Sequence, residues 1–163
     1  MADKTLTVTS TLFADGETIP DAAVHQSAGG QNRSPALSWD AGPNGTQSYT
    51  VTCYDPDAPT GIGFVHWVLF NVDAGTTSLP EGAGAQGSNP SGSALGFTDW
   101  GESQYGGMAP PPGDSPHHYH FTVQALDVPA VDIGPETTYA KLRFMTKDHV
   151  LAEGTITGLY AAS

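Results

Sequence analysis

The chain has 163 residues, which fits a single domain over residues 1–163 that can bury a core without disulfides or metals as supports. Seventeen acidic and five basic residues give a formal net charge of -12, which repels a phosphate backbone and argues against nucleic acid as a partner. The N-terminal residues lack the basic and apolar regions of a secretory signal, and no stretch reaches the roughly 18 apolar residues of a membrane span. We therefore expect a cytoplasmic protein.

Short apolar runs separated by turn residues predict a mostly β domain. The 20 glycines and 13 prolines are spread along the chain, which is typical of many strands joined by turns. We expect strands at residues 6–10, 36–39, 48–54, 65–72, 118–126 and 154–160. One helix is expected at 136–150, where Leu142, Met145 and His149 follow three- and four-residue spacing. The stretch 81–113 is too long for an ordinary connection and predicts a functional loop or a lid.

An acidic turn follows the predicted strand at 48–54, with the sequence Asp-Pro-Asp-Ala-Pro at 55–59. Its prolines restrict the backbone, so Asp55 and Asp57 are presented with little entropy left to lose on meeting a ligand. If the turn brings both carboxylates to one opening, their repulsion raises one pKa and they can share a proton while binding a polar ligand. The alternative is a pair of turn-forming aspartates that cap backbone amides.

Histidines mark two of the predicted strands. His66 begins an apolar stretch, either as a core histidine bonded to the backbone or as a donor aimed at the same opening as the acidic turn. Period two over 118–126 predicts one face with Tyr119, Phe121 and Val123, and an opposite face with His118, His120 and Thr122. His117 should lie on the side of Tyr119. The histidine cluster could suggest a transition metal, but a His-Glu-x-x-His helix and a second cysteine are missing, so no metal is expected.

Signals for nucleophilic catalysis are weak. The pattern Gly-x-Ser-x-Gly is missing, which disfavours a serine hydrolase, and Cys53 lies in an apolar run where a small buried hydrophobe is expected. The run 106–113 could expose backbone N–H groups at its glycine end and form a rigid wall at its proline end. The alternative is a plain structural turn.

Six motifs that follow one another along nearly the whole chain can be compared with known families, at 34–39, 54–61, 66–72, 105–113, 116–127 and 148–154. With these motifs the chain resembles the phosphatidylethanolamine-binding proteins, also called Raf kinase inhibitor-like proteins, and in particular their bacterial and archaeal branch. The resemblance implies a β-sandwich with one or two peripheral helices, a small anion-binding pocket at one end, and no metal or organic cofactor. It implies a pocket lined by Asp55, Asp57, Pro59, His66, Trp67, Gly107, Pro111, His117 and Tyr119.

The resemblance implies a binding or regulatory protein, not an enzyme, that holds a phosphate, a phosphoethanolamine-like group or a small carboxylate. Because Asp55 and Asp57 oppose an anion, binding should rely on a charged His66 or His117 and on N–H groups near Gly107. Affinity should then fall as the pH rises through the histidine range.

Two alternatives stay open beside anion binding. One is hydrolysis of a phosphate or carboxylic ester, with Asp55 or Asp57 as general base and His66 as general acid. The other is inhibition of a protein kinase or a protease through the rim at 109–112; the bacterial branch also suggests a homodimer. The chain departs from the family at His118, where arginine is usual, and at Met108, where proline is frequent, and we expect a looser rim and a softer pocket wall.

Overall fold

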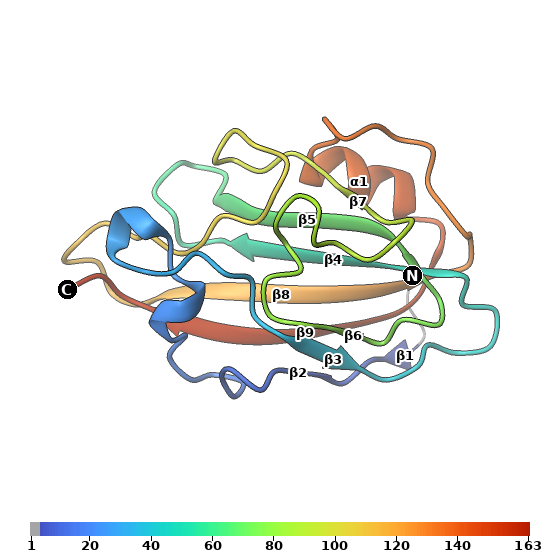
Figure 1. The fold of residues 1–163 in the computed structure, drawn as a ribbon, viewed down its shortest axis with the longest axis horizontal. Helices are drawn as coiled ribbons and strands as arrows, with labels where there is room; N and C mark the ends of the chain where they lie inside the picture. The colour runs from blue at the N-terminus through green and yellow to red at the C-terminus, as the bar shows by residue number, and fades with distance from the viewer. Residues whose placement is uncertain (1–3) are drawn as a thin grey trace.

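A six-stranded sheet forms the main layer of the computed structural model, which describes residues 4–163 (Figure 1). In spatial order it contains β1 (Lys4–Thr5), β9 (Val150–Tyr160), β8 (His117–Leu126), β4 (Ser48–Asp55), β5 (Phe64–Asp73) and β7 (Ala94–Leu95). β1 pairs with β9 in parallel, and the other neighbours are antiparallel. The starts and ends of the long strands therefore alternate along each of the two opposite ends of the sheet.

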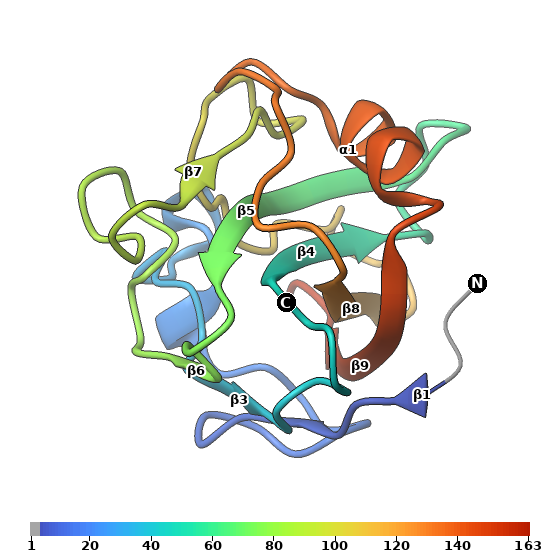
Figure 2. The same cartoon turned by 90° about the vertical axis from the view of Figure 1, so that its right-hand side faces the viewer.

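A smaller sheet covers one face of this layer and makes the molecule a sandwich. It contains β2 (Val8–Thr9), β3 (Leu37–Trp39) and β6 (Ser78–Leu79). The main core lies between the sheets, where Leu37 and Leu79 of the small sheet join Val51, Trp67 and Phe121 of the large one. Figure 2 shows α1 (Tyr139–Thr146) on the other side of the large sheet from β3 and β6. The mostly β sandwich with a peripheral helix is confirmed.

Burial on both faces explains the composition of β5. Trp67 and Leu69 point into the core between the sheets, whereas Val68 and Phe70 pack with Leu142 beneath α1. Such a strand has no solvent face and is therefore almost entirely apolar. The predicted strands at 48–54, 65–72 and 118–126 each lie within one residue of the observed bounds of β4, β5 and β8.

Three predictions of secondary structure had wrong bounds. The helix expected at 136–150 is shorter; Thr138 caps it by accepting from the N–H of Lys141, and it ends at Thr146. Val150 already pairs with Leu126 of β8, so the strand expected at 154–160 begins four residues earlier. Pairing with β8 outweighs the local helical spacing there. Of the strand expected at 6–10, only Val8–Thr9 forms a strand, β2; β1 precedes the predicted range and belongs to the other sheet.

The remaining segments connect the layers. Two 3-10 turns, η1 (Asp21–Ala23) and η2 (Gln26–Ala28), precede the small sheet's second strand. The long stretch 81–113 contains β7 and otherwise follows turns and irregular backbone. Within residues 4–163, no helix has the length and apolar character needed to cross a membrane.

Candidate functional site

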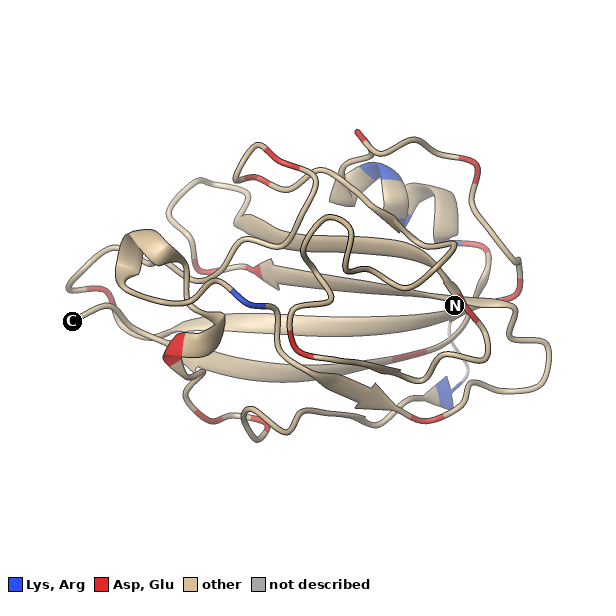
Figure 3. Ribbon diagram, viewed as in Figure 1, with Lys and Arg blue, Asp and Glu red and all other residues tan. Residues whose placement is uncertain are grey.

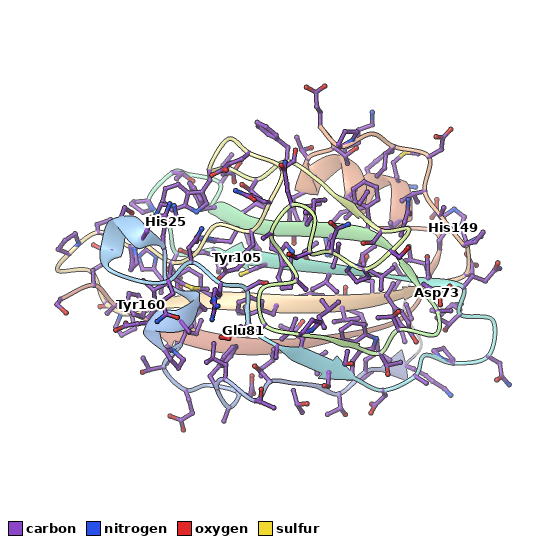
Figure 4. All side chains as sticks on the ribbon, in the orientation of Figure 1. His25, Asp73, Glu81, Tyr105, His149 and Tyr160 are labelled. Atoms are coloured by element: carbon purple, nitrogen blue, oxygen red, sulfur yellow. The ribbon has the colours of Figure 1, made fainter. Side chains whose placement is uncertain are left out.

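A cavity of about 400 Å³ lies where three long strands meet at one end of the sandwich. β4 runs antiparallel to β5 and β8, so the last residue of β4 lies beside the first residues of the other two. The cavity is lined by Asp55, Ala58, Pro59, Thr60, Phe64, His66, Asp99, Trp100, Ala109, Pro110, Pro111, His117 and Tyr119. In Figure 4, His25 and Tyr160 mark this end, and His149 and Asp73 mark the opposite end.

The histidine at the start of β8 is clamped between two carboxylates. His117 Nδ1 lies 2.7 Å from Asp55 Oδ2, and His117 Nε2 lies 2.9 Å from Asp114 Oδ2. A carboxylate only accepts, so both ring nitrogens donate when the ring is charged. Burial disfavours the charged ring, but the hydrogen bonds to Asp55 and Asp114 prevail and raise the pKa of His117. His117 therefore has no free N–H to offer a ligand.

Asp55 is oriented by the turn that follows it. Its Oδ1 accepts from the backbone N–H of Asp57 at 2.7 Å, while Oδ2 faces His117. The first aspartate of the turn thus caps the second, which is the backbone-capping arrangement considered for this turn. The capping holds the Asp55 carboxylate at the cavity wall without a second carboxylate beside it.

His66 enters the cavity because of a β-bulge. Cys53 of β4 pairs with Trp67, and Tyr54 pairs with Val65, so His66 is the extra residue of β5. Bulges commonly redirect a side chain next to a binding or active site. Nδ1 of His66 donates to the carbonyl of Gly106 at 2.7 Å, and Nε2 has no hydrogen bond within residues 4–163. Burial lowers the pKa of His66 to about 4 although the Gly106 carbonyl acts in the opposite direction.

Aromatic rings form much of the wall. His66 meets Tyr119 edge-on with ring centroids 5.3 Å apart, and Phe64 meets Trp100 edge-on at 5.4 Å. Trp100 is held from behind by His25, stacked at 3.8 Å with an interplanar angle of 6°. Burial raises the pKa of Tyr119, so its hydroxyl keeps its proton, and this hydroxyl has no hydrogen bond within the described residues.

Six of the nine residues implied by the resemblance lie together at the cavity, and three do not. The six are Asp55, Pro59, His66, Pro111, His117 and Tyr119. Trp67 points from β5 into the core between the sheets. Gly107 is committed elsewhere, because its N–H donates to Asn32 Oδ1 and its carbonyl accepts from Trp100 Nε1. The expected anion site on the N–H groups near Gly107 is therefore not formed by that residue.

Asp57 is the third residue outside the cavity. Its Oδ2 accepts from the backbone N–H of His118 at 2.7 Å and faces His118 Nδ1 at 2.8 Å. These hydrogen bonds, from the side chain first and then the backbone, lower the pKa of Asp57. We expected a looser rim at His118, but His118 pairs with Asp57 there through both its backbone N–H and its ring. The Met108 side chain is wholly buried and fills the core, so it forms no part of the cavity wall.

Phe64, Asp99 and Trp100 line the cavity but were missed from the sequence. Asp99 and Trp100 lie in the loop expected to be functional, and the Asp99 carboxylate accepts from the N–H of Val65 at 2.7 Å. A single tryptophan between polar and glycine residues of a long loop was the available signal. Its position beside Phe64 depends on contacts between distant segments, which strand periodicity does not contain.

No permanent positive charge lines the cavity. The basic residues, blue in Figure 3, include Lys141 and Arg143 on α1, and neither they nor the other lysines and arginines of residues 4–163 lie among the lining residues. No group of three or more His, Cys, Asp or Glu residues in the described part of the chain is arranged to hold a metal ion. The cavity therefore offers hydrogen bonds and aromatic faces instead of strong cations.

Comparison with known proteins agrees with this architecture. The family model described as phosphatidylethanolamine-binding protein matches residues 9–161. The UPF0098 protein YbhB of Escherichia coli (strain K12) is 43% identical over 150 residues, which cover 90% of this chain and 94% of YbhB.

Solved structures give the same result. The crystal structure of E. coli YbcL, described as a new member of the mammalian PEBP family, matches with a TM-score of 0.92 at 38% identity, covering 97% of this chain and 99% of YbcL. The homologue CT736 of Chlamydia trachomatis D/UW-3/CX matches with a TM-score of 0.83 at 27% identity, covering 99% of this chain and 100% of CT736. The family model and the identity to YbhB together show that this chain belongs to the phosphatidylethanolamine-binding protein family.

Proposed function

We propose that this protein binds a small phosphoryl-bearing anion in the cavity at the strand ends. The observation that carries the proposal is a pair of polar atoms that are open to the cavity and have no hydrogen-bond partner in residues 4–163, Nε2 of His66 and the hydroxyl of Tyr119, on side chains that are otherwise almost wholly buried. Buried polar groups nearly always have a hydrogen-bond partner. A ligand or water in the cavity would supply it for both atoms.

The size and the walls of the cavity support a small ligand. About 400 Å³ is near the lower end of the range of small-molecule sites. Ala58, Pro59 and Pro110 provide rigid apolar contacts, and Ala109 is a further lining residue whose backbone N–H has no acceptor within the described residues. Such an N–H is a suitable donor for a phosphoryl oxygen. The ligand would fit as a compact head group.

The geometry gives less support to the hydrolytic scheme. Asp57 is bound to His118 outside the cavity, and Asp55 is occupied by His117 and the turn. His66 presents a lone pair at Nε2 at neutral pH, so it has no proton to donate as a general acid toward the cavity. The regulatory role, the kinase or protease partner and the homodimer stay predictions of the resemblance.

Calorimetry with inorganic phosphate and with phosphoethanolamine tests the proposal at pH 6. Tyr119→Phe removes only the hydroxyl that faces the cavity. A hydrogen bond to a charged ligand contributes about 1.5–3 kcal/mol, so this variant should bind about 10- to 150-fold more weakly. Tyr139→Phe is the matched control, since the Tyr139 ring stacks on Tyr54 outside the cavity. Equal affinity in both variants, or no binding by the unaltered protein, would contradict the proposal.

A further inference from the structure

The cavity presents more hydrogen-bond acceptors than donors to its contents. His66 binds the Gly106 carbonyl through Nδ1, and a carbonyl can only accept, so the proton of the neutral ring is on Nδ1. Nε2 then carries a lone pair. Because this ring is buried and charges only near pH 4, it is an acceptor throughout the neutral range.

The charged residues around the cavity add further acceptors. Asp55 and Asp99 line it as carboxylates. Of the two lining histidines, His66 is neutral above about pH 4, and both nitrogens of His117 already donate to Asp55 and Asp114 when its ring is charged. A fully deprotonated oxyanion would place its oxygens against the lone pair of His66 and near these carboxylates without neutralising any of them.

We propose that the site selects oxyacids that retain a proton, so that a phosphoryl hydroxyl donates to Nε2 of His66 while Tyr119 and the Ala109 N–H donate to the other oxygens. This inference rests on the proposed function and specifies its ligand class. Phosphate and phosphate monoesters carry such a proton as monoanions, with a second pKa of about 6 for the monoesters. Sulfate has no proton at neutral pH, although its size and shape are similar. The site should therefore bind phosphate monoanions and reject sulfate.

Other groups that titrate face the same space, and they define the competing explanation. Asp55 comes from β4, His117 and Tyr119 from β8, and Asp99 from the loop before Trp100. Asp114, in the turn before β8, is not a lining residue but contacts His117. His25 lies behind Trp100. Of these, His117 has a raised pKa, and its loss of a proton would add negative charge beside the cavity as the pH rises. That effect depends on the protein alone, whereas the proposed effect follows the second pKa of the ligand.

A ligand series separates the two explanations in the unaltered protein. Calorimetry between pH 5 and pH 8 would compare inorganic phosphate, O-phosphoethanolamine, methylphosphonate and sulfate. We expect the pH at which affinity starts to fall to shift with the second pKa of each phosphorus ligand, with about tenfold loss per pH unit above it. Sulfate should not bind at any of these pH values. A fall at one fixed pH for every ligand would assign the effect to His117 and overturn the inference.

The outcomes also distinguish this inference from the proposed function. Equal binding of phosphate and sulfate, without pH dependence, would keep the anion site and overturn proton selection. If no ligand binds at any pH, both proposals fail. Nitrogen-detected NMR of the histidine rings provides an independent readout: His66 should be the neutral Nδ1–H tautomer from pH 6 to pH 8. A proton on Nε2 in that range would overturn the inference, whatever the affinities.

Discussion

Two aspartate–histidine pairs lie next to each other at one end of the sandwich, and only one of them belongs to the cavity. Asp55 and His117 have side chains only 3% and 4% exposed, whereas those of Asp57 and His118 are 40% and 54% exposed. The pairs have nearly the same separation, 2.7 Å and 2.8 Å. Similar chemistry and distance thus occur in two different dielectric surroundings.

The alternation of β8 produces this difference. Successive side chains of a strand point to opposite faces, so His117 points inward with Tyr119 and His118 points outward. A buried ion pair is costly to break, because the partner left behind is an uncompensated buried charge, whereas an exposed pair is replaced by water. The Asp55–His117 pair therefore forms part of the cavity wall, and the exposed Asp57–His118 pair stabilises the rim only slightly.

The largest expected effect comes from truncating the buried carboxylate. Asp55→Ala leaves His117 with one carboxylate and frees the N–H of Asp57, so the free energy of unfolding should fall by about 3–5 kcal/mol. Asp57→Ala is the matched control and should lose less than about 1 kcal/mol. Urea unfolding at pH 7 measures both. Similar losses in the two variants would remove the distinction between the pairs.

Lowering the pH should reduce the free energy of unfolding through His66, which is buried and neutral in the cavity. The His66 ring titrates near about 6.5 in the unfolded chain and at about 4 in the folded protein. The unfolded state therefore binds the proton first, and the His66 contribution is complete above pH 6.5 and decreases as the pH falls toward 4. The loss should reach about 3 kcal/mol relative to His66→Gln. Parallel unfolding curves of the two proteins from pH 7.5 to pH 4 would contradict a buried neutral ring.

A smaller dependence of opposite sign is expected from His117. Its folded-state pKa is raised, so its contribution is complete below about pH 6.5 and is lost as the pH rises through the raised value. Unfolding of the unaltered protein and of His117→Gln should therefore differ most at pH 6 and converge at higher pH. A difference that grows with pH would show that the clamp does not hold a charged ring.

The smallest effect should come from the exposed pair. His118→Ala removes a contact with Asp57 that is open to solvent, so the free energy of unfolding should change by about 0–1 kcal/mol, and less at high salt. His149→Ala, which breaks a similarly exposed pair with Asp127 at the opposite end, gives the reference. A much larger loss for His118→Ala than for His149→Ala would mean that the rim pair is coupled to the cavity.

Strands with strong local patterns were predictable from the sequence, and boundaries set by pairing were not. β4, β5 and β8 have apolar runs or strict alternation that needs no partner to be recognised. The start of β9 at Val150 was misread as helix, because the local spacing fits a helix and only the pairing with Leu126 selects a strand. The division between β1 and β2 likewise depends on which sheet each segment joins.

The part of the candidate site that lies at the ends of strongly patterned strands was predictable. Asp55, His66 and Tyr119 lie at the ends of predicted strands, so their meeting at one edge follows from antiparallel pairing. Gly107 was misplaced because its N–H is taken by Asn32, 75 residues away in sequence. Trp67 packs in the core between the sheets, whereas His66 lines the cavity, and the sequence alone did not distinguish these two neighbours.

The sequence by itself determined the family, the mostly β pattern, and the residue types at the strand ends: carboxylates, histidines and a tyrosine. The tertiary structure alone decided which of them are charged and which nitrogen carries a proton. Gly106, which orients His66, is 40 residues away from it, and Asp55 is 62 residues from His117. Protonation depends on burial and on the partners of a ring, and both arise only when these distant segments pack together.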